Sequence, residues 1–86
     1  MKRQVRWTDR ARKDIARLDR LTRERLTQSV ERLAGTGQGD VKRLQGLDDE
    51  TYRLRVGDWR ILFRLEEGAL VLLVLRALPR GGAYKP

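Results

Sequence analysis

Tyr52-Arg53-Leu54-Arg55-Val56-Gly57-Asp58-Trp59-Arg60-Ile61-Leu62-Phe63-Arg64-Leu65 is the stretch that decides the fold of this 86-residue chain. Apolar and basic side chains alternate on both sides of Gly57-Asp58, a dipeptide suited to a two-residue turn. Alternation with a period of two is typical of a strand with one covered face and one open face. The segment therefore predicts a β-hairpin with strands over 52–56 and 59–65.

A two-residue turn also fixes which residues lie opposite each other. If Val56 faces Trp59, one step back from the turn places Arg55 directly opposite Arg60. The apolar face then holds Tyr52, Leu54, Val56, Trp59, Ile61 and Phe63. The other face holds Arg53, Arg55, Arg60 and Arg64, with Leu62 and, from the next strand, Val71, Leu73 and Leu75 as an apolar floor.

The arginine face has a functional and a purely structural interpretation. Like charges directly opposite each other destabilise a sheet by a few tenths to about 1 kcal/mol, so folding alone does not favour this pairing. Guanidinium groups beside an apolar floor suit a phosphate or a base. The bland alternative is that the arginines are the solvated side of a half-buried sheet.

Upstream of the hairpin, the pattern predicts a short strand and two helices. Val5 and Trp7 give residues 3–7 strand character, and Thr8-Asp9 can begin a helix. Apolar residues at three- and four-residue spacing predict a first helix over about 9–19. Thr22 is a candidate N-cap for a second helix, which runs to Gly35 and ends in the glycine-rich loop 35–40. The two helices are therefore expected to form an αα-hairpin.

The remaining segments complete the predicted sheet. Residues 41–44 form a possible short strand, and 46–50 a polar turn. Residues 70–75 are apolar at every position, which is typical of a strand covered on both faces. The order β-α-α-β-β-β predicts an α+β fold, with an N-terminal strand and an αα-hairpin packed on an antiparallel sheet. Residues 1–86 are expected to form a single domain.

The end of the chain adds two side chains to the arginine face. The last strand runs antiparallel to its neighbour, so its end near Ala77 returns to the hairpin turn and brings Arg80 close to Arg55 and Arg60. Tyr84 follows four residues later and can supply a stacking ring or a phenolic proton.

Composition excludes several chemistries and favours a polyanionic partner. The chain has no cysteine and no histidine, which removes disulfides, thiol nucleophiles, imidazole catalysis and the usual zinc sites. The acidic run 48–50 lacks the convergence that a metal site needs. The net charge of +8 favours nucleic acid, the ribosome or an acidic protein. Neither a membrane span nor a signal peptide is evident, so a cytoplasmic location is expected.

Three segments together resemble the RelE/ParE toxin superfamily. They are Lys42-Arg43-Leu44-Gln45-Gly46, the hairpin segment at 52–65, and Arg80 followed by Tyr84. The resemblance implies a RelE-like fold and a toxin of a type II toxin–antitoxin system, with a protein antitoxin that wraps it and blocks its active surface. For the RelE branch it implies ribosome-dependent cleavage of messenger RNA, and for the ParE branch inhibition of DNA gyrase. Both branches share the fold, which cannot choose between them.

The resemblance also assigns residues. Carried over position by position, the catalytic set falls on Arg53, Arg55, Arg60, Arg80 and Tyr84, with Arg64, Arg43 and Lys42 binding RNA phosphates. The implied reaction is attack by a ribose 2′-hydroxyl on the adjacent phosphate, and it needs no metal or cofactor. The chain departs from the best-known RelE pattern because it has arginine at 53 and 55, where lysines can stand.

An arginine stays protonated, so neither Arg53 nor Arg55 is a plausible general base. Tyr84 is left as the only obvious titratable candidate. A RelE-like messenger RNA interferase is the first hypothesis. A ParE-like gyrase inhibitor without nuclease activity is the second, and a non-toxic RNA- or ribosome-binding module is the third.

Overall fold

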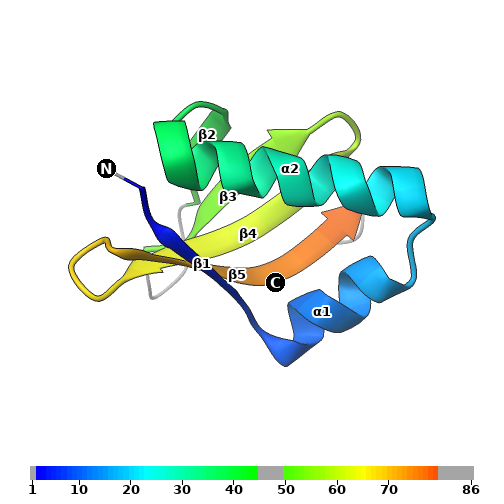
Figure 1. Ribbon diagram of the computed structural model, residues 1–86, viewed down its shortest axis with the longest axis horizontal. Helices are drawn as coiled ribbons and strands as arrows, with labels where there is room; N and C mark the ends of the chain where they lie inside the picture. The colour runs from blue at the N-terminus through cyan, green and yellow to red at the C-terminus, as the bar shows by residue number, and fades with distance from the viewer. Residues whose placement is uncertain (1, 45–49, 80–86) are drawn as a thin grey trace.

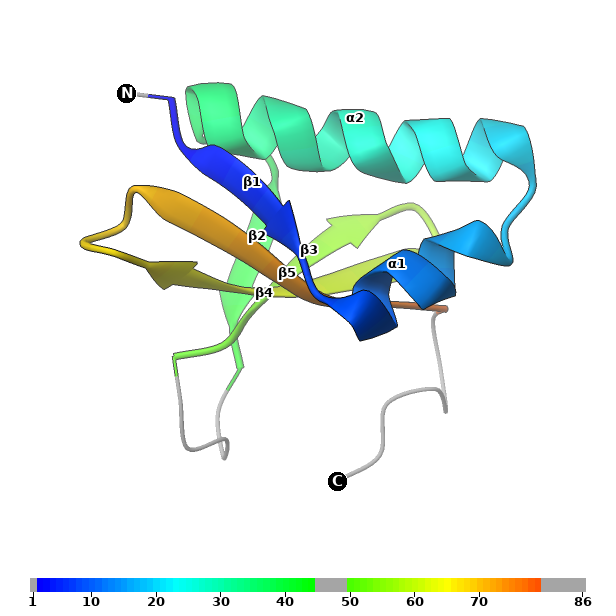
Figure 2. The ribbon, with the colours of Figure 1, turned by 60° about the horizontal axis from the view of Figure 1, so that its bottom comes forward.

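The structure, a computed structural model, describes residues 2–44 and 50–79 as two helices and a five-stranded sheet. The elements are β1 (Gln4–Trp7), α1 (Asp9–Ala16), α2 (Arg20–Thr36), β2 (Asp40–Arg43), β3 (Tyr52–Val56), β4 (Trp59–Glu66) and β5 (Val71–Pro79). Helix α2 lies across one face of the sheet, and α1 lies beside β5 (Figures 1 and 2). Within the described residues, neither helix is long and apolar enough to cross a membrane.

The strands lie in the order β1-β5-β4-β3-β2. The pairs β2–β3, β3–β4 and β4–β5 are antiparallel, whereas β1 runs parallel to β5, from Gln4 opposite Val71 to Trp7 opposite Val74. The predicted α+β fold is confirmed, although the sheet is mixed and not purely antiparallel. The sequence of a four-residue strand carries no signal for its direction, which here depends on a partner more than 60 residues away.

The helices are divided at a different residue from the one the sequence indicated. Helix α1 ends at Ala16, and α2 begins at Arg20 with Asp19, and not Thr22, as its N-cap. The Asp19 carboxylate accepts hydrogen bonds from the Thr22 N–H at 3.1 Å and the Thr22 hydroxyl at 2.6 Å. A carboxylate at this position satisfies a free helical N–H group and faces the positive end of the helix dipole, so it fixes the start of the helix.

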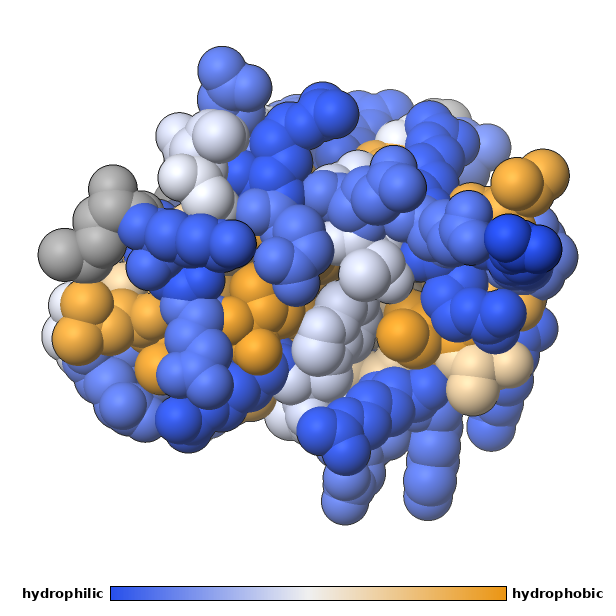
Figure 3. Space-filling model, viewed as in Figure 1, coloured by the Kyte–Doolittle hydropathy of each residue, from blue (hydrophilic) through white to orange (hydrophobic). Residues whose placement is uncertain are grey.

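The core fills the space between α2 and the covered face of the sheet. The buried residues Leu26, Val30 and Leu33 of α2 belong to the same cluster as Leu54, Ile61 and Phe63 of the hairpin. Trp7 and Trp59 pack against this cluster while partly exposed. Hydrophilic side chains cover most of the outer surface on this side, with apolar atoms visible between them (Figure 3). The apolar face predicted for the hairpin is therefore the face under α2.

A β-bulge in β5 changes which side chains reach the opposite face. Leu62 pairs with Arg76 and Phe63 with Val74, so Leu75 is an extra residue without a cross-strand partner on β4. Simple alternation places Leu75 on the arginine face. Beyond the bulge, the alternation is shifted by one residue, so that Leu78 lies directly opposite Arg60.

Asp14 of α1 fastens this helix to the edge of β5. Its carboxylate accepts hydrogen bonds from Arg76 Nε at 2.8 Å and from the Ala77 N–H at 2.9 Å. Burial raises the pKa of the carboxyl, but the hydrogen bonds from Arg76 and Ala77, together with the Arg76 charge, outweigh it and leave the pKa below the ordinary 3.8. Asp14 thus completes the hydrogen bonding of β5 beyond the point where β1 ends.

We predict that Asp14→Ala lowers the free energy of unfolding by about 1–3 kcal/mol, because a buried N–H and a guanidinium lose their acceptor. The folded pKa of Asp14 is depressed, so its stabilisation is present above 3.8 and is lost as the pH falls through the folded pKa. Urea unfolding should show a large difference from wild type near pH 7 and a smaller one below about pH 4.

The matched control is Glu31→Ala, which removes an exposed carboxylate from α2. It should leave the free energy of unfolding within about 0.5 kcal/mol of wild type. An Asp14→Ala difference that is the same at neutral and acid pH would contradict the role assigned to this carboxylate.

Candidate nucleic-acid interface

The hairpin has the register that the sequence predicted. Val56 pairs with Trp59, Arg55 with Arg60 and Tyr52 with Phe63. Gly57, the first residue of the turn, has a φ of 58°, which favours glycine and matches the turn expected of a two-residue hairpin loop. Arg55 and Arg60 therefore lie side by side on the face of the sheet turned away from α2.

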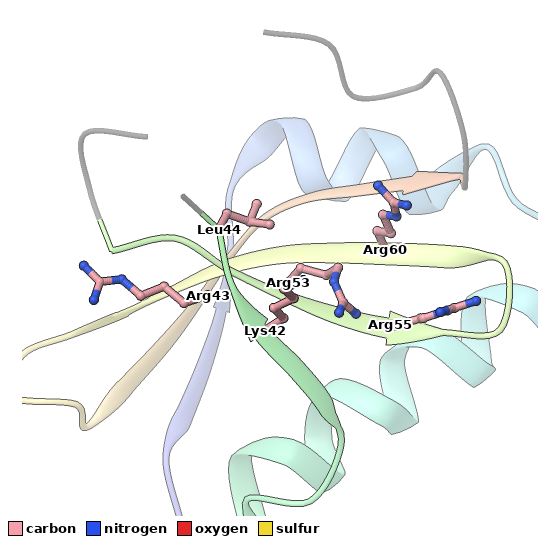
Figure 4. Close-up of a pocket in the computed structure, with 6 residues that line it drawn as sticks. All are labelled: Lys42, Arg43, Leu44, Arg53, Arg55 and Arg60. Atoms are coloured by element: carbon pink, nitrogen blue, oxygen red, sulfur yellow. The ribbon is translucent and has the colours of Figure 1, made fainter. Parts of the chain in front are cut away.

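Strand β2 brings another cation to this face. Lys42 pairs with Arg53, and Asp40 pairs with Arg55. The two strands of the hairpin and β2 together surround an open hollow of about 510 Å³. It is lined by Lys42, Arg43, Leu44, Arg53, Arg55 and Arg60 (Figure 4). Five of these six side chains are basic, so we name this set the arginine hollow.

The cations of the arginine hollow are held in different ways. The Arg53 side chain is only 16% exposed, and its Nη1 lies 3.4 Å from the Asp40 carbonyl oxygen and 3.8 Å from the Asp40 carboxylate. Arg55 and Arg60 are exposed, and neither forms an ion pair with a carboxylate within residues 2–44 and 50–79. Arg53 is thus fixed in place, whereas Arg55 and Arg60 present their charge to an incoming anion.

An apolar floor lies next to the arginines. Leu62 and Leu78 are 6% and 7% exposed and, with Leu44, line a small hollow beside Arg53 and Arg60. Apolar neighbours keep water away and strengthen the attraction between a guanidinium and a phosphate. Leu62 was expected in this floor, whereas Leu44 and Leu78 were missed because the end of an edge strand and a bulge leave no clear periodicity.

Of the three predicted phosphate-binding residues, Arg64 lies outside the arginine hollow, Arg43 lies at its margin and Lys42 lies within it. Arg64 is absent from the described lining of the hollow, and its Nη2 lies 3.2 Å from the Glu66 carboxylate. The Arg43 side chain points away from Arg53 and Arg55 (Figure 4), and its Nη2 lies 3.9 Å from Glu50. Lys42 lies beside Arg53, as a phosphate-binding role requires.

The predicted positions Arg80 and Tyr84 lie outside the described residues. The same holds for positions 48 and 49 of the acidic run. Among the residues that the structure describes, no group of three or more acidic side chains is placed to hold a metal ion.

The arginine hollow is equipped for charge stabilisation and poorly equipped for proton transfer. Guanidinium groups donate hydrogen bonds to phosphate oxygens in a fixed fork and do not release protons. Lys42 carries the one described lining side chain whose charge can be lost by deprotonation. The geometry therefore supports binding of a phosphate and stabilisation of the charge that develops on it.

Residues 5–84 match the family model of the ParE toxin of type II toxin–antitoxin systems. The chain belongs to this family. The match includes the whole hairpin and β2, so every described residue of the arginine hollow lies in the family domain. No curated protein matches the chain by sequence.

Solved toxin–antitoxin structures share the fold of this toxin. The RelE–RelB complex of Pyrococcus horikoshii is similar with a TM-score of 0.77 and 26% identity, over 96% of this chain and 100% of the other. The RelBE2 complex of Mycobacterium tuberculosis is similar with a TM-score of 0.82 and 23% identity, over 93% of both chains. The RelBE complex of E. coli is similar with a TM-score of 0.70 and 17% identity, over 92% of this chain and 96% of the other. The predicted RelE/ParE superfamily is confirmed.

We predict that Arg60→Thr raises the free energy of unfolding by a few tenths to about 1 kcal/mol, because it removes the repulsion between directly opposed like charges. Arg60 is the suitable member of the pair, since its other cross-strand neighbour is Leu78, whereas Arg55 also faces Asp40. Urea unfolding measures the change. Arg60→Lys keeps the charge and should unfold like wild type, and a destabilised Arg60→Thr would contradict the proposed cost of the pair.

Proposed function

We propose that this toxin is a metal-independent endoribonuclease that cleaves messenger RNA on the ribosome. The observation that carries the proposal is the arginine hollow, where Lys42, Arg53, Arg55 and Arg60 lie together on an open sheet face with an apolar floor. Folding gains nothing from placing Arg55 opposite Arg60, whereas a phosphate between them would offset the repulsion. RNA supplies both that phosphate and a neighbouring 2′-hydroxyl.

The proposed reaction begins with attack of a ribose 2′-oxygen on the adjacent phosphorus. The bond from phosphorus to the 5′-oxygen of the next nucleotide breaks, which leaves a 2′,3′-cyclic phosphate and a free 5′-hydroxyl. Extra negative charge develops on the phosphate oxygens, and Arg55 and Arg60 stabilise it from a preorganised position. Arg53 contributes from the side, held by Asp40.

The proton of the 2′-hydroxyl needs an acceptor, and the leaving oxygen needs a donor. Tyr84 is the candidate carried by the sequence, with Arg80 as a further cation. Arg64, paired with Glu66, is proposed to guide the RNA electrostatically and not to contact the reacting phosphate. Lys42 and Arg43 are proposed to bind flanking phosphates.

A protein antitoxin is the proposed partner of this toxin. The similar solved structures from Pyrococcus horikoshii, Mycobacterium tuberculosis and E. coli are toxin–antitoxin complexes. The net charge of +8 and the arginine hollow suit an acidic antitoxin segment that occupies the phosphate positions and blocks the RNA.

We predict that Arg60→Ala lowers the rate of messenger RNA cleavage on translating ribosomes by about 100-fold or more, the usual cost of losing one group that stabilises transition-state charge. Primer extension on a ribosome-bound message measures the new 5′ ends. Arg12→Ala, which removes an exposed arginine from α1, is the charge-matched control and should cleave at the wild-type rate. Absence of new 5′ ends with folded wild-type protein would refute the nuclease proposal.

Inhibition of DNA gyrase is the second candidate, favoured by the family model that the chain matches and by the shortage of proton-transfer groups in the described hollow. In that case the arginine hollow would bind an acidic surface of the target protein and cleave nothing. A supercoiling assay separates the two proposals. Gyrase that remains fully active at saturating toxin would refute gyrase inhibition.

A further inference from the structure

A second set of cations lies on α2, close to the hairpin and outside the arginine hollow. Arg25, Ser29 and Arg32 follow each other at four- and three-residue spacing, so they form one stripe along the helix. The stripe flanks the buried residues of α2. Seven residues of helix separate the two arginines by about 10 Å along its axis, which places them at different phosphates of an extended strand.

A small hollow connects this stripe with the end of β3, next to the residues that lead into β2. It has a volume of about 160 Å³ and is lined by Ser29, Arg32, Gln38, Gly39, Leu54, Arg55 and Val56. Arg55 also lines the arginine hollow on the other side of the sheet. Arg55 therefore lines both hollows, and a chain bound in one of them can continue into the other past the end of β3, at the hairpin turn.

Arg25 of α2 lies against the turn of the hairpin, close to Arg55. A Cβ atom at Gly57 would lie 2.7 Å from Arg25 Nη2, so the guanidinium packs directly on the turn. A further hollow of about 110 Å³ at this turn is lined by Arg55, Gly57, Asp58, Trp59 and Arg60. The tip of the hairpin therefore has Arg25 against it, with Arg55 and Arg60 beside it.

The charges on this path are not neutralised by the carboxylates of the described chain. Within residues 2–44 and 50–79, neither Arg25 nor Arg32 forms an ion pair, whereas Arg20 on the same helix is paired with Glu24. Asp58 lines the hollow at the turn and adds one negative charge there. Four guanidinium groups, those of Arg25, Arg32, Arg55 and Arg60, therefore outnumber the carboxylates near the hairpin turn.

We propose that Arg25 and Arg32 bind phosphates of the RNA strand whose cleaved phosphate lies in the arginine hollow, and so extend the RNA-binding surface past the hairpin turn onto α2. The inference rests on the proposed ribonuclease function and specifies the path of the substrate. Arg55 is the junction, the arginine hollow holds the reacting phosphate, and α2 holds its neighbours along the strand. Gln38 lines the same path and supplies a polar side chain to the strand.

The test compares two double variants with the same loss of charge. Arg25→Gln/Arg32→Gln removes the proposed contacts, and Arg10→Gln/Arg12→Gln removes two exposed arginines of α1, which lies beside β5 and not β3. The probe is a fluorescein-labelled twelve-nucleotide oligouridylate, titrated at several salt concentrations. Losing two phosphate contacts on a single strand should lower the slope of log affinity against log salt by about 1.4 in magnitude.

The α1 double variant should keep the wild-type slope. Because Arg25 packs on the turn, Arg25→Lys/Arg32→Lys is a second variant that restores charge without the guanidinium planes, and it should recover the slope if phosphate binding is the role. Circular dichroism confirms that each variant is folded.

Equal slopes for the two glutamine variants, or no measurable binding of the oligouridylate by wild type, would overturn the inference. Failure of the proposed function is read separately from primer extension on ribosomes. If wild type cleaves the message but Arg25→Gln/Arg32→Gln keeps the wild-type slope, the nuclease proposal stands and the α2 contact with RNA is refuted. If Arg25→Gln/Arg32→Gln lowers the slope but wild type does not cleave the message, the α2 contact with RNA stands and the nuclease proposal is refuted.

Discussion

The register of the β3–β4 hairpin is the constraint on which the site depends. With Val56 opposite Trp59, the apolar residues of both strands face α2 and the arginines face away from it. A slip of one residue in a strand would exchange its two faces and turn guanidinium groups into the core. A buried, unpaired charge is far more costly than the cross-strand repulsion between Arg55 and Arg60, so the core enforces the juxtaposition of these two charges.

The surrounding elements complete what the hairpin begins. Strand β2 adds Lys42 beside Arg53 and provides Asp40, which holds the Arg53 guanidinium. The bulge at Leu75 brings Leu78 opposite Arg60 and closes the apolar floor. Helix α2 covers the opposite face and places Arg25 against the turn. The register of the hairpin thus determines where its arginines lie, which apolar residues lie beside them and which turn Arg25 contacts.

Much of this could be predicted from the sequence because it depends on local periodicity. The turn at Gly57, the pairing of Arg55 with Arg60 and the sorting of faces follow from alternation and a two-residue loop. The parallel direction of β1, the division of the helices at Asp19 and the bulge at Leu75 depend on contacts between distant segments or on competing caps. Alternation alone therefore missed Leu78.

The proximity of the α2 arginines to the hairpin was also beyond the sequence pattern. Arg25 and Arg32 look like ordinary members of a charged helix face, and only the tertiary structure shows that Arg25 packs on Gly57 and that Arg32 lies near the end of β3. The predicted roles of Arg80 and Tyr84 remain hypotheses about residues outside the described part of the chain.

Phosphate binding between Arg55 and Arg60 is tested most directly by an electron cryomicroscopy structure of the toxin on a ribosome that carries messenger RNA with a non-cleavable 2′-deoxy nucleotide. The expected result is a message phosphate in contact with Arg55 and Arg60 on the open sheet face. A bound toxin whose α2-free sheet face is turned away from the message, or a toxin that does not bind the programmed ribosome, would contradict it.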